Sequence, residues 1–363
     1  MKVLHLETGR HLYGGARQVA YLLDGLRDHD VDNVLVCPRG SAIADAVPPE
    51  SARVQTLALG GDLDIGSIGR LRRVIRRERP DIVHLHSRRG ADTFGALAAL
   101  GSGARVVLSR RVDNPESMLA VQLKYRLYDH VITISHAIGD VLSGQGVAES
   151  KMTCVHSAVD PAPWRESVPR TVLDEEFSLE PGAPVVGMAA QFIRRKGHDV
   201  LLDALPRVVE AWPHLQILLF GKGREQERIQ HRVMTAGLSR NVIFAGFRND
   251  LSRWFGALDL LVHPALAEGL GVALLQGAAA GVPMVAGDAG GIGEIIIDQQ
   301  TGRLVPPGDA TALAAAMLEL LDDHDKAARL ARHAREHLER SFSVAAMARG
   351  NLAVYRAVLG QSA

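Results

Sequence analysis

The chain has 363 residues, of which 47% are hydrophobic and 23% charged, and its 41 basic and 41 acidic residues give no formal net charge. That composition is ordinary for a soluble globular protein, and it provides no overall positive field that would favour nucleic acid as a partner. Two cysteines without metal-ligand spacing indicate a reduced compartment, and Glu7 interrupts any apolar signal segment, so we expect a cytoplasmic protein.

The first half of the chain alternates short apolar runs with longer amphipathic ones. Strands are predicted at 3–7, 33–38, 81–87, 105–110 and 130–135, and helices at 16–29, 70–80 and around 116–129. Fully apolar short strands that are separated by helices are typical of a parallel sheet covered on both faces.

A second array of the same kind follows residues 160–184, which contain five prolines and are predicted to be a linker. Further strands are predicted at 185–192, 215–221, 241–247, 258–264 and 283–287, and a terminal helix at 343–359. The sequence therefore predicts an α/β protein with two doubly wound, Rossmann-like parallel-sheet domains, at 1–165 and 166–342. We expect them to face each other across a ligand-binding cleft, and the last segment, 343–363, to pack back on the first domain.

Glycines precede a helix in two loops, an arrangement that binds phosphate through backbone N–H groups. Gly14 and Gly15 separate the first strand from the first helix, where an ordinary tight turn is the alternative interpretation. In the second array Arg194, Arg195 and Lys196 fill the corresponding loop. Fixed cations there suit a diphosphate, with a solvated basic turn as the alternative, and Lys196 is one of only six lysines.

A third glycine pair, Gly221 and Gly223, also follows a predicted strand. Gln226 stands where a dinucleotide fingerprint has its next glycine, so a Rossmann dehydrogenase is not supported. A turn of this kind can still pass close to a nucleotide.

The segment 267–283, AEGLGVALLQGAAAGVP, belongs to an uncharged run, 269–287, that nearly reaches the roughly 20 residues needed to span a membrane, but glycines and a proline interrupt it. It is better interpreted as a loop followed by a helix whose first turn faces a ligand. Glu268 can accept hydrogen bonds from ligand hydroxyls while the N–H groups of Gly269, Leu270 and Gly271 bind an oxyanion; a simple helix cap is the alternative. Glu294, which follows two glycines, repeats the pattern.

Taken in order, these motifs resemble the retaining glycosyltransferases of family 4 (group 1), which have the GT-B architecture of two Rossmann-like domains. The resemblance covers essentially the whole chain and is strongest over 185–308. It implies transfer of a sugar from a nucleotide-diphosphate sugar to a hydroxyl of a glycan or glycolipid, with the anomeric configuration kept. Lys196 and a neighbouring arginine would neutralise the diphosphate, Gly14 and Gly15 would close over it, and Glu268 would hold the sugar.

The resemblance also places His86, in the run HLHS, at the reacting centre, where it would orient the acceptor or accept a sugar hydroxyl. A buried histidine in a strand-end network is the alternative. The chain departs from the family pattern at two donor-binding positions, because Gln276 replaces a glutamate that binds the ribose and Gln191 replaces an arginine. Glutamine loses the charge-assisted hydrogen bond, so we expect nucleotide affinity to fall by about 1–2 kcal/mol.

No metal and no bound cofactor are expected, since the nucleotide-sugar serves as co-substrate. Asp62 and Asp64 match a D-x-D metal motif, as do Asp28 and Asp30, but the single-domain fold that uses this motif would leave the second array unexplained. By resemblance alone, UDP is the favoured nucleotide and bacterial surface polysaccharide or lipopolysaccharide the favoured product. A nucleotide-sugar binder without transfer activity and a GT-B nucleotide-sugar epimerase are the alternatives.

Residues 70–111 contain 11 arginines and only three acidic residues, so this part of the first domain is locally basic. This region would dock on anionic lipid at the inner face of the membrane or on a phosphorylated acceptor, or would simply be a solvated helix face in an arginine-rich chain. Arg110 and Arg111 follow a strand end and would alternatively meet an acidic acceptor.

Overall fold

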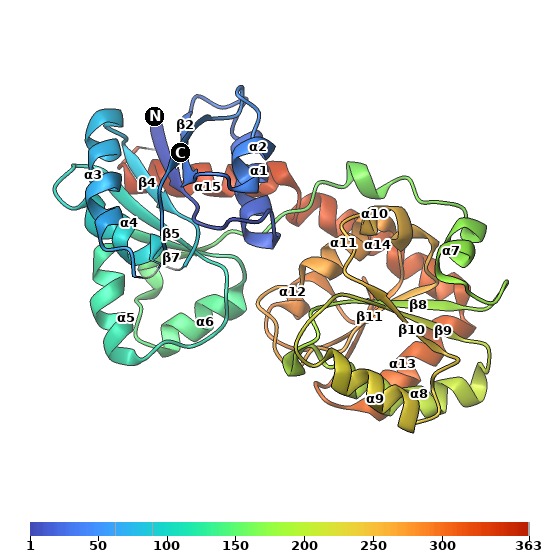
Figure 1. The fold of residues 1–363 in the computed structure, drawn as a ribbon. Helices are drawn as coiled ribbons and strands as arrows, with labels where there is room; N and C mark the ends of the chain where they lie inside the picture. Colours follow the sequence, from blue (N-terminus) through green and yellow to red (C-terminus); the bar gives the residue numbers. More distant parts are fainter. Residues whose placement is uncertain (62, 89, 362–363) are drawn as a thin grey trace. The chain divides into compact units, whose positions relative to one another are not determined.

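The computed structural model describes residues 1–61, 63–88 and 90–361, and it divides the chain into two compact units (Figure 1). Unit 1 comprises Met1–Ala158 and Val344–Ala363, and unit 2 comprises Val159–Ser343. The division after Ala158 comes before the boundary expected at residue 165. Unit 1 therefore contains the start of the chain together with its last helix.

Unit 1 has, among the residues described, a seven-stranded parallel sheet in the order β3-β2-β1-β4-β5-β6-β7. Its strands are β1 (Lys2–Leu6), β2 (Asp32–Pro38), β3 (Arg53–Leu57), β4 (Ile82–Leu85), β5 (Arg105–Arg110), β6 (His130–Thr133) and β7 (Met152–Cys154). Its helices are α1 (Gly14–Gly25), α2 (Ala42–Ala46), α3 (Gly66–Glu78), α4 (Ala91–Ala99), α5 (Met118–Lys124), α6 (His136–Gly144) and α15 (Val344–Val358). Alternate side chains of β1 enter different cores, because Leu4 and Leu6 pack with α3 and α4 whereas Val3 packs with α1 and α15.

Unit 2, whose residues are all described, has a six-stranded parallel sheet in the order β10-β9-β8-β11-β12-β13. Its strands are β8 (Val185–Ala189), β9 (Gln216–Phe220), β10 (Val242–Gly246), β11 (Leu260–His263), β12 (Met284–Gly287) and β13 (Arg303–Val305). Its helices are α7 (Arg170–Phe177), α8 (His198–Ala211), α9 (Gln226–Thr235), α10 (Leu251–Trp254), α11 (Val272–Ala280), α12 (Ile292–Ile295), α13 (Ala310–Asp322) and α14 (His324–Ser341). Helices α8 and α13 pack on one face of the sheet. Gly277 of α11 packs closely on Leu261 and Met284.

The prediction of two doubly wound parallel-sheet domains is confirmed by these two sheets. Three strands, β3, β7 and β13, are absent from the prediction. Each is the outermost strand at an edge of its sheet, and its residues are mostly half-buried or exposed. An edge strand is covered on fewer sides, so its sequence lacks the continuous apolar run by which the central strands are predicted.

The prediction that residues 160–184 form a linker is wrong, because this stretch is built into unit 2. Trp164 is 6% exposed, and its ring lies 5.5 Å from that of Phe255. Helix α7 buries Leu173, and Arg170 at its start donates to Asp259 at 2.9 Å. Only a few residues of this stretch are buried, and the prolines and acidic residues around them remove the periodic apolar pattern by which a packed segment is predicted.

The last helix, α15, packs on unit 1 beside α1. Its Met347, Ala348 and Tyr355 belong to the same core as Val3 and Leu22. Gly25 of α1 allows the close approach, since a Cβ at that position would lie 2.9 Å from the side chains of α15. Within the described part of the chain, none of the helices has both the length and the apolar character needed to cross a bilayer.

Candidate active site

Both sheets contain a switch point, where the chain connections to two neighbouring strands run in opposite directions. It lies between β1 and β4 in unit 1 and between β8 and β11 in unit 2. In open parallel sheets ligands bind outside the carboxyl ends of the strands at such a point. The predicted catalytic residues His86, Lys196 and Glu268 follow β4, β8 and β11, and Gly14 follows β1.

In unit 2 the structure brings Lys196, His263 and Glu268 together, and we call this group the lysine–glutamate cluster. Lys196 ends the short 3₁₀ turn after β8, and its ammonium group donates to Oε2 of Glu268. Nε2 of His263, the last residue of β11, lies 3.0 Å from the same oxygen. The N–H of Gly269 donates to the other carboxylate oxygen at 3.1 Å. The side chains of Lys196 and Glu268 are only 14% and 11% exposed.

These partners keep Glu268 ionised. Burial alone would raise the pKa of its carboxyl group, but the hydrogen bond from His263 and the positive charge of Lys196 lower that pKa to about 2. An ionised carboxylate only accepts hydrogen bonds, so Nε2 of His263 carries the proton of that bond. Nδ1 of His263 is buried and has no partner among the residues described. The cluster therefore offers a fixed cation beside a fixed anion.

The glycines around the lysine–glutamate cluster are needed for packing. Gly197, between Lys196 and α8, has φ +76°, and a Cβ there would overlap the carbonyl oxygen of Pro264. Gly221, with φ +143°, approaches the carbonyl of Ala190 in the same way. Gly223 lies against the backbone of Phe192, and Gly290 against that of Glu268. The loops after β8, β9, β11 and β12 therefore contact one another through backbone that only glycine permits.

The paired glycines of unit 1 have different surroundings. Gly14 and Gly15 begin α1 and are exposed. A Cβ at Gly14 would meet nothing within 4 Å, and one at Gly15 would meet only the side chain of Arg111, at 4.0 Å. The packing of unit 1 therefore does not require glycine at these two positions, and open space lies in front of the helix.

Three histidines are buried at the carboxyl edge of the unit 1 sheet, and we call them the histidine cluster: His5 of β1, His84 of β4 and His86. Nδ1 of His5 lies 3.0 Å from Nε2 of His86, and Nε2 of His5 lies 3.1 Å from Oδ1 of Asn33. His84 bonds instead to the hydroxyl of Tyr355, at 2.6 Å, and to that of Ser109, at 2.8 Å. These residues continue the face of the sheet that carries Val3 and Ile82 in its apolar part.

Burial keeps the histidine cluster neutral. It lowers the pKa of His5 to about 4, although the hydrogen bond to Asn33 acts in the other direction. The pKa values of His84 and His86 also fall well below the usual range, mainly through burial and then through neighbouring positive charge, including that of Arg111. Glu7, after β1, completes this edge: burial raises its pKa, and the Gly9 amide and Arg111 oppose that rise.

Comparison with known proteins places the chain among enzymes. Residues 13–163 match the family described as Glycosyltransferase Family 4, and residues 183–323 match Glycosyl transferases group 1. A glycogen synthase of Mycobacterium tuberculosis is 30% identical to the chain over 306 residues, which make up 78% of this chain and 70% of that protein. The chain belongs to the group 1 glycosyltransferases. The family resemblance inferred from the motifs is thereby confirmed.

Two further proteins resemble this glycosyltransferase over almost its whole length. The lipopolysaccharide core biosynthesis glycosyltransferase LpsE of Rhizobium meliloti is 27% identical over 354 residues, 94% of this chain and 95% of that protein. The structure of HepE from Anabaena in complex with UDP-glucose is 20% identical, with a TM-score of 0.85 over 98% of this chain and 100% of that chain. The fold of this glycosyltransferase is therefore GT-B, as predicted.

The remaining donor-binding residues predicted for the glycosyltransferase are more scattered. Gln191 and Arg194 are exposed after β8, and Arg194 lies 3.6 Å from Glu225 rather than beside Glu268. The backbone carbonyl of Arg195 accepts from Leu266 at 2.8 Å, which joins the loops after β8 and β11. Gln276 is half-buried on α11, and Glu294 is half-buried on α12.

One detail of the loop after β11 differs from expectation. Gly269, Leu270 and Gly271 are buried rather than exposed, and the N–H of Gly269 is occupied by the carboxylate of its own neighbour, Glu268. The cause is local, because the backbone N–H of Gly269 is next to Glu268 in the chain and is within reach of its carboxylate. The amide of Gly269 therefore orients Glu268 in this structure.

His263, His5 and Asn33 were not predicted from the sequence. A signal was present for each, because a polar residue stands within or at the end of an apolar strand in LDLLVHP, VLHLE and DNVLV. Such a residue is buried on a strand and needs a partner. His5 has two such partners far along the chain: His86, which directly follows β4 and is 81 residues away, and Asn33 of β2, which is 28 residues away. Spacing along the chain does not indicate such pairs.

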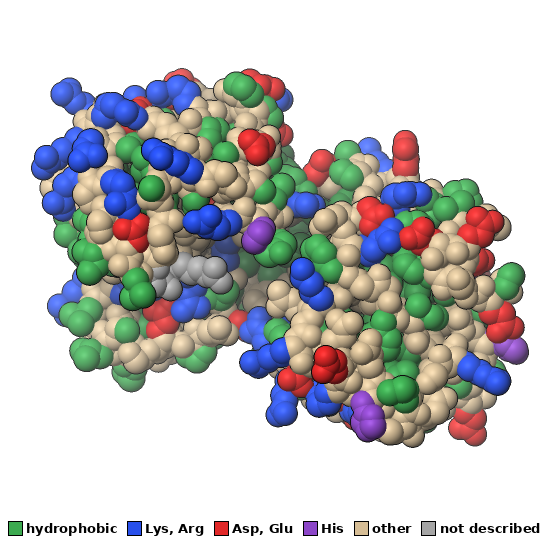
Figure 2. All heavy atoms as spheres, in the orientation of Figure 1, with side chains coloured by type: hydrophobic (Ala, Val, Ile, Leu, Met, Phe, Trp, Pro, Cys, Tyr) green, Lys and Arg blue, Asp and Glu red, His purple; other side chains and the backbone are tan. Residues whose placement is uncertain are grey.

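The D-x-D motifs and the basic region are only partly covered by the structure. Asp62 and Arg89 lie outside the described residues. Asp64 forms an ion pair with Arg70 and accepts from the N–H of Gly60 at 2.7 Å. Arg72 donates to a backbone carbonyl of α4 at 2.9 Å, and buried Arg110 pairs with Glu116 at 2.5 Å. Figure 2 shows Lys and Arg side chains gathered over the part of unit 1 that contains α3.

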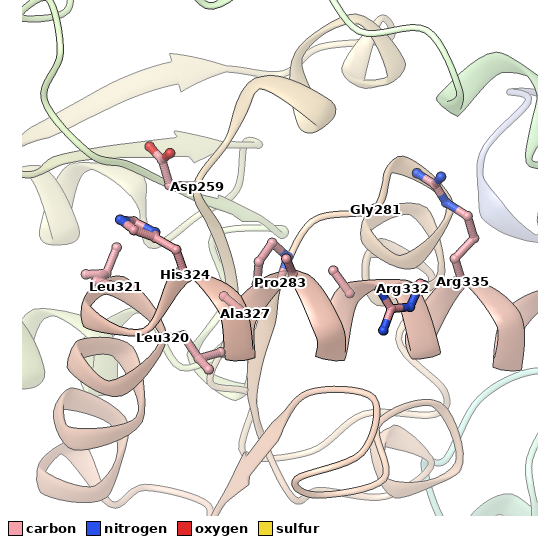
Figure 3. Close-up of a pocket in the computed structure, with 11 residues that line it drawn as sticks. Asp259, Gly281, Pro283, Leu320, Leu321, His324, Ala327, Arg332 and Arg335 are labelled. Carbon is pink, nitrogen blue, oxygen red and sulfur yellow. The ribbon is translucent and has the colours of Figure 1, made fainter.

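A cavity of about 380 Å³ lies at the opposite edge of the unit 2 sheet (Figure 3). Asp259 and Pro283, which line it, immediately precede β11 and β12, so the cavity faces the amino ends of these strands. Its remaining lining comes from Gly281, at the end of α11, and from the helices α13 and α14, including Arg332 and Arg335. The sheet separates it from the lysine–glutamate cluster, and it is not part of the candidate active site.

Proposed function

We propose that this glycosyltransferase moves a sugar from a nucleotide-diphosphate sugar, with UDP as the favoured nucleotide, to a hydroxyl of a glycan or glycolipid, and keeps the anomeric configuration. The observation that carries the proposal is the pair of Lys196 and Glu268 at the carboxyl edge of the unit 2 sheet, with Lys196 in the turn that precedes α8. An ammonium group beside a helix N-terminus attracts a diphosphate. The ionised carboxylate next to it accepts hydrogen bonds from sugar hydroxyls.

Lys196 is assigned to the leaving group. Negative charge develops on the diphosphate as the glycosidic bond breaks, and a preorganised cation stabilises that charge. An ammonium group has three N–H donors, and the bond to Glu268 uses one of them, which leaves two for diphosphate oxygens. Lys196 would thus supply the charge that a divalent metal supplies in other transferases, and the proposed reaction is metal-independent.

Glu268 is assigned to the sugar and not to proton transfer. With a pKa of about 2 it remains ionised at neutral pH and has no proton to give to a leaving group. Its charge instead stabilises the oxocarbenium-like sugar. The acceptor oxygen bonds to the anomeric carbon on the face from which the diphosphate departs, and a diphosphate oxygen takes the acceptor's proton. Atoms and charge balance without a protein base.

The choice of substrates rests on relatives. HepE from Anabaena was solved with UDP-glucose, and the name of LpsE assigns it to lipopolysaccharide core biosynthesis. Both support, for this chain, a UDP-sugar donor and an acceptor that belongs to a bacterial surface polysaccharide or lipopolysaccharide.

The test combines binding and turnover. Thermal shift with UDP-, GDP-, ADP- and dTDP-sugars identifies the donor, and nucleotide release with chelator present measures transfer to candidate acceptors. Lys196→Met should lower kcat/KM at least about 100-fold. The control is Lys326→Met, which also removes a lysine of unit 2 that pairs with a glutamate, here Glu319 of α13, and it should leave kcat/KM unchanged. Binding without turnover would favour the nucleotide-sugar binder, for which Gln276 is the specific observation. Conversion of the sugar without an acceptor would favour the epimerase.

We propose in addition that unit 1 contacts an anionic membrane surface through α3. Arg73, Arg76 and Arg79 are exposed on this helix and at its end, while Arg72 is tied to α4 and serves the fold. Each basic group near an anionic surface contributes about 1 kcal/mol. Arg73/Arg76/Arg79→Gln should reduce co-sedimentation with phosphatidylserine vesicles, and the exposed α14 triple Arg329/Arg332/Arg340→Gln is the control. Unchanged partitioning of the first variant would exclude this contact.

A further inference from the structure

The histidine cluster contains a hydrogen-bond chain whose direction is fixed at one end. Nδ2 of Asn33 lies 3.2 Å from the backbone carbonyl oxygen of Ser51, which can only accept. The amide nitrogen of Asn33 therefore points at Ser51, and its oxygen, Oδ1, points at His5. Because Oδ1 also only accepts, the ring nitrogen that faces it at 3.1 Å, Nε2 of His5, must carry a hydrogen.

The direction then passes from His5 to His86. With its hydrogen on Nε2, neutral His5 presents a lone pair at Nδ1. Nε2 of His86 faces that lone pair at 3.0 Å and must donate to it. The two ring planes are nearly parallel, at 8°, and the ring centroids are 5.2 Å apart. That separation fits two rings that meet nitrogen to nitrogen along the line of their centres, which is the geometry of an N–H···N hydrogen bond.

The series of hydrogen bonds from Ser51 through Asn33 and His5 ends at Nδ1 of His86, an acceptor without a partner among the residues described. Once Nε2 of His86 carries the hydrogen, Nδ1 of the neutral ring carries a lone pair. His86 is 3% exposed, and its Nδ1 has no hydrogen-bond partner among the residues described. A buried polar atom without a partner is destabilising, so native proteins keep few of them. This one lies at the carboxyl edge of the sheet, at the switch point between β1 and β4.

A metal ion is the competing interpretation of three clustered histidines. It fits the geometry less well, because both nitrogens of His5 and both of His84 already have protein partners. The lone pair of His5 points straight at His86, whereas two histidines on one ion direct their lone pairs at a common third point. The positive charge of Arg111 also acts on the cluster and would oppose a cation there.

We propose that Asn33 and His5 are positioning residues that hold His86 as the Nε2-protonated neutral tautomer, so that its Nδ1 accepts a hydrogen bond from a substrate hydroxyl. The hydroxyl belongs to the sugar or to its acceptor, and this part of the inference rests on the proposed glycosyl transfer. The tautomer itself does not depend on it. His84, which bonds to Tyr355 of α15 and to Ser109, lies outside the chain of donors and serves packing.

The tautomer is tested on the full chain labelled with ¹⁵N-histidine. Long-range ¹⁵N–¹H correlation spectra distinguish a protonated ring nitrogen from one that carries a lone pair, and the signal lost in His86→Gln assigns His86. We expect hydrogen on Nε2 and a lone pair on Nδ1 at pH 7. Hydrogen on Nδ1, or on both nitrogens, would overturn the proposal. The unaltered protein decides this, so the result does not depend on whether a variant folds.

The positioning role is tested with Asn33→Leu, which removes the acceptor that fixes the hydrogen of His5 on Nε2 and so the direction of the hydrogen bonds. We expect His86 to become a mixture of tautomers. The control is Asn241→Leu in unit 2, because Asn241 is also buried and donates to backbone carbonyls, at 2.8 and 3.1 Å, without contacting a histidine. A His86 signal unchanged in Asn33→Leu would overturn the proposal. So would stoichiometric Zn²⁺ that shifts the signals of His5, His84 and His86 together, because that is the behaviour of a metal site.

The substrate contact is tested by transfer kinetics of the same variants. Asn33→Leu should lower kcat about tenfold or more, the effect of one misdirected hydrogen bond, while UDP binding stays unchanged. Asn241→Leu should keep kcat. A shifted tautomer with unchanged kcat would overturn the contact with substrate. If no donor supports transfer even in the unaltered protein, the proposed function fails, while the tautomer is still decided by the spectra.

Discussion

The carboxyl edges of the two sheets differ in the side chains that are buried there. In unit 2 the edge is charged and tightly packed, with an ion pair between Lys196 and Glu268 and with glycines against neighbouring backbone. In unit 1 the edge is a network of neutral buried histidines, and Gly14 stands in open space. Both edges lie at a switch point of the same type of sheet. The same topology therefore leaves the chemistry of the edge undetermined.

The difference also shows that glycine has two meanings in a binding-loop motif. Gly197 and Gly221 are required by the fold, because their Cβ atoms would overlap a carbonyl oxygen of the next loop. Gly14 is not required by the fold. Its main physical effect is to keep the space at the start of α1 free of a side chain. A ligand that approaches the start of α1 would use that space.

Gly197→Ala should have the largest effect and would separate these two meanings. The positive φ and the overlap with Pro264 force the loops after β8 and β11 apart, so we expect the free energy of unfolding of unit 2 to fall by more than about 4 kcal/mol. Gly14→Ala should change stability by less than about 0.5 kcal/mol. All three tryptophans lie in unit 2 and all five tyrosines in unit 1, so urea unfolding can be followed separately in each unit. Equal losses of unfolding free energy in Gly197→Ala and Gly14→Ala would show that the two glycines do not differ in their importance for the fold.

Lys196→Met tests the charged edge. It leaves the carboxylate of Glu268 buried without its cation, so we expect the pKa of Glu268 to rise and the free energy of unfolding at pH 7 to fall by about 3 kcal/mol. The double variant Lys196→Met/Glu268→Gln should recover part of that loss. In unit 1, His86→Gln removes no charge and should cost about 1–2 kcal/mol. A larger loss in His86→Gln than in Lys196→Met would reverse the comparison.

Acid should weaken the two edges in different pH windows. The pKa of His5 is about 4 in the folded chain against 6.5 in the unfolded one, so the unfolded chain takes up its proton first as pH falls. The contribution of His5 is complete above pH 6.5, and about 3 kcal/mol of it is lost between pH 6.5 and 4. His84 and His86 act in the same direction, while the raised pKa of Glu7 partly offsets them.

Unit 2 should resist this first window better. The lowered pKa of Glu268 makes its contribution complete above pH 4.5, and that contribution is lost as pH falls through about 2. At this edge only His198 loses stabilising free energy between pH 6.5 and 4, as His5 does in unit 1, because burial lowers the pKa of His198 to about 4. Hydrogen exchange resolved by peptide at about pH 7 and pH 5 measures both units in one sample. Greater opening of unit 2 than of unit 1 at the lower pH would contradict the prediction.

Gln276→Glu should have the smallest effect. If residue 276 contacts the ribose, a carboxylate there strengthens the hydrogen bond, and we expect the Kd of the nucleotide to fall by up to about tenfold. Calorimetric titration of UDP measures the change. Gln300→Glu adds the same charge to an exposed loop before β13 and serves as the control. Equal changes in both variants would point to overall charge rather than to a ribose contact.

The sequence predicted the fold better than it predicted the site. Central strands and their helices follow from apolar runs and helical spacing, whereas the edge strand β3 is too polar, and β7 and β13 are too short, for that signal. Lys196 and Glu268 were both predicted, but as separate contacts to a ligand rather than as partners of each other. Their bond joins residues 72 positions apart, and the packing of β8 beside β11 creates it.

The sequence by itself determined which side chains reach the carboxyl edges, because the period of a strand and the position of its end are local properties. Only the tertiary structure decided the states of those side chains: Glu268 as an anion bound to Lys196, and His5 and His86 as neutral, directed donors. Ionisation and tautomer depend on burial and on partners from other strands, and both arise when the sheets assemble.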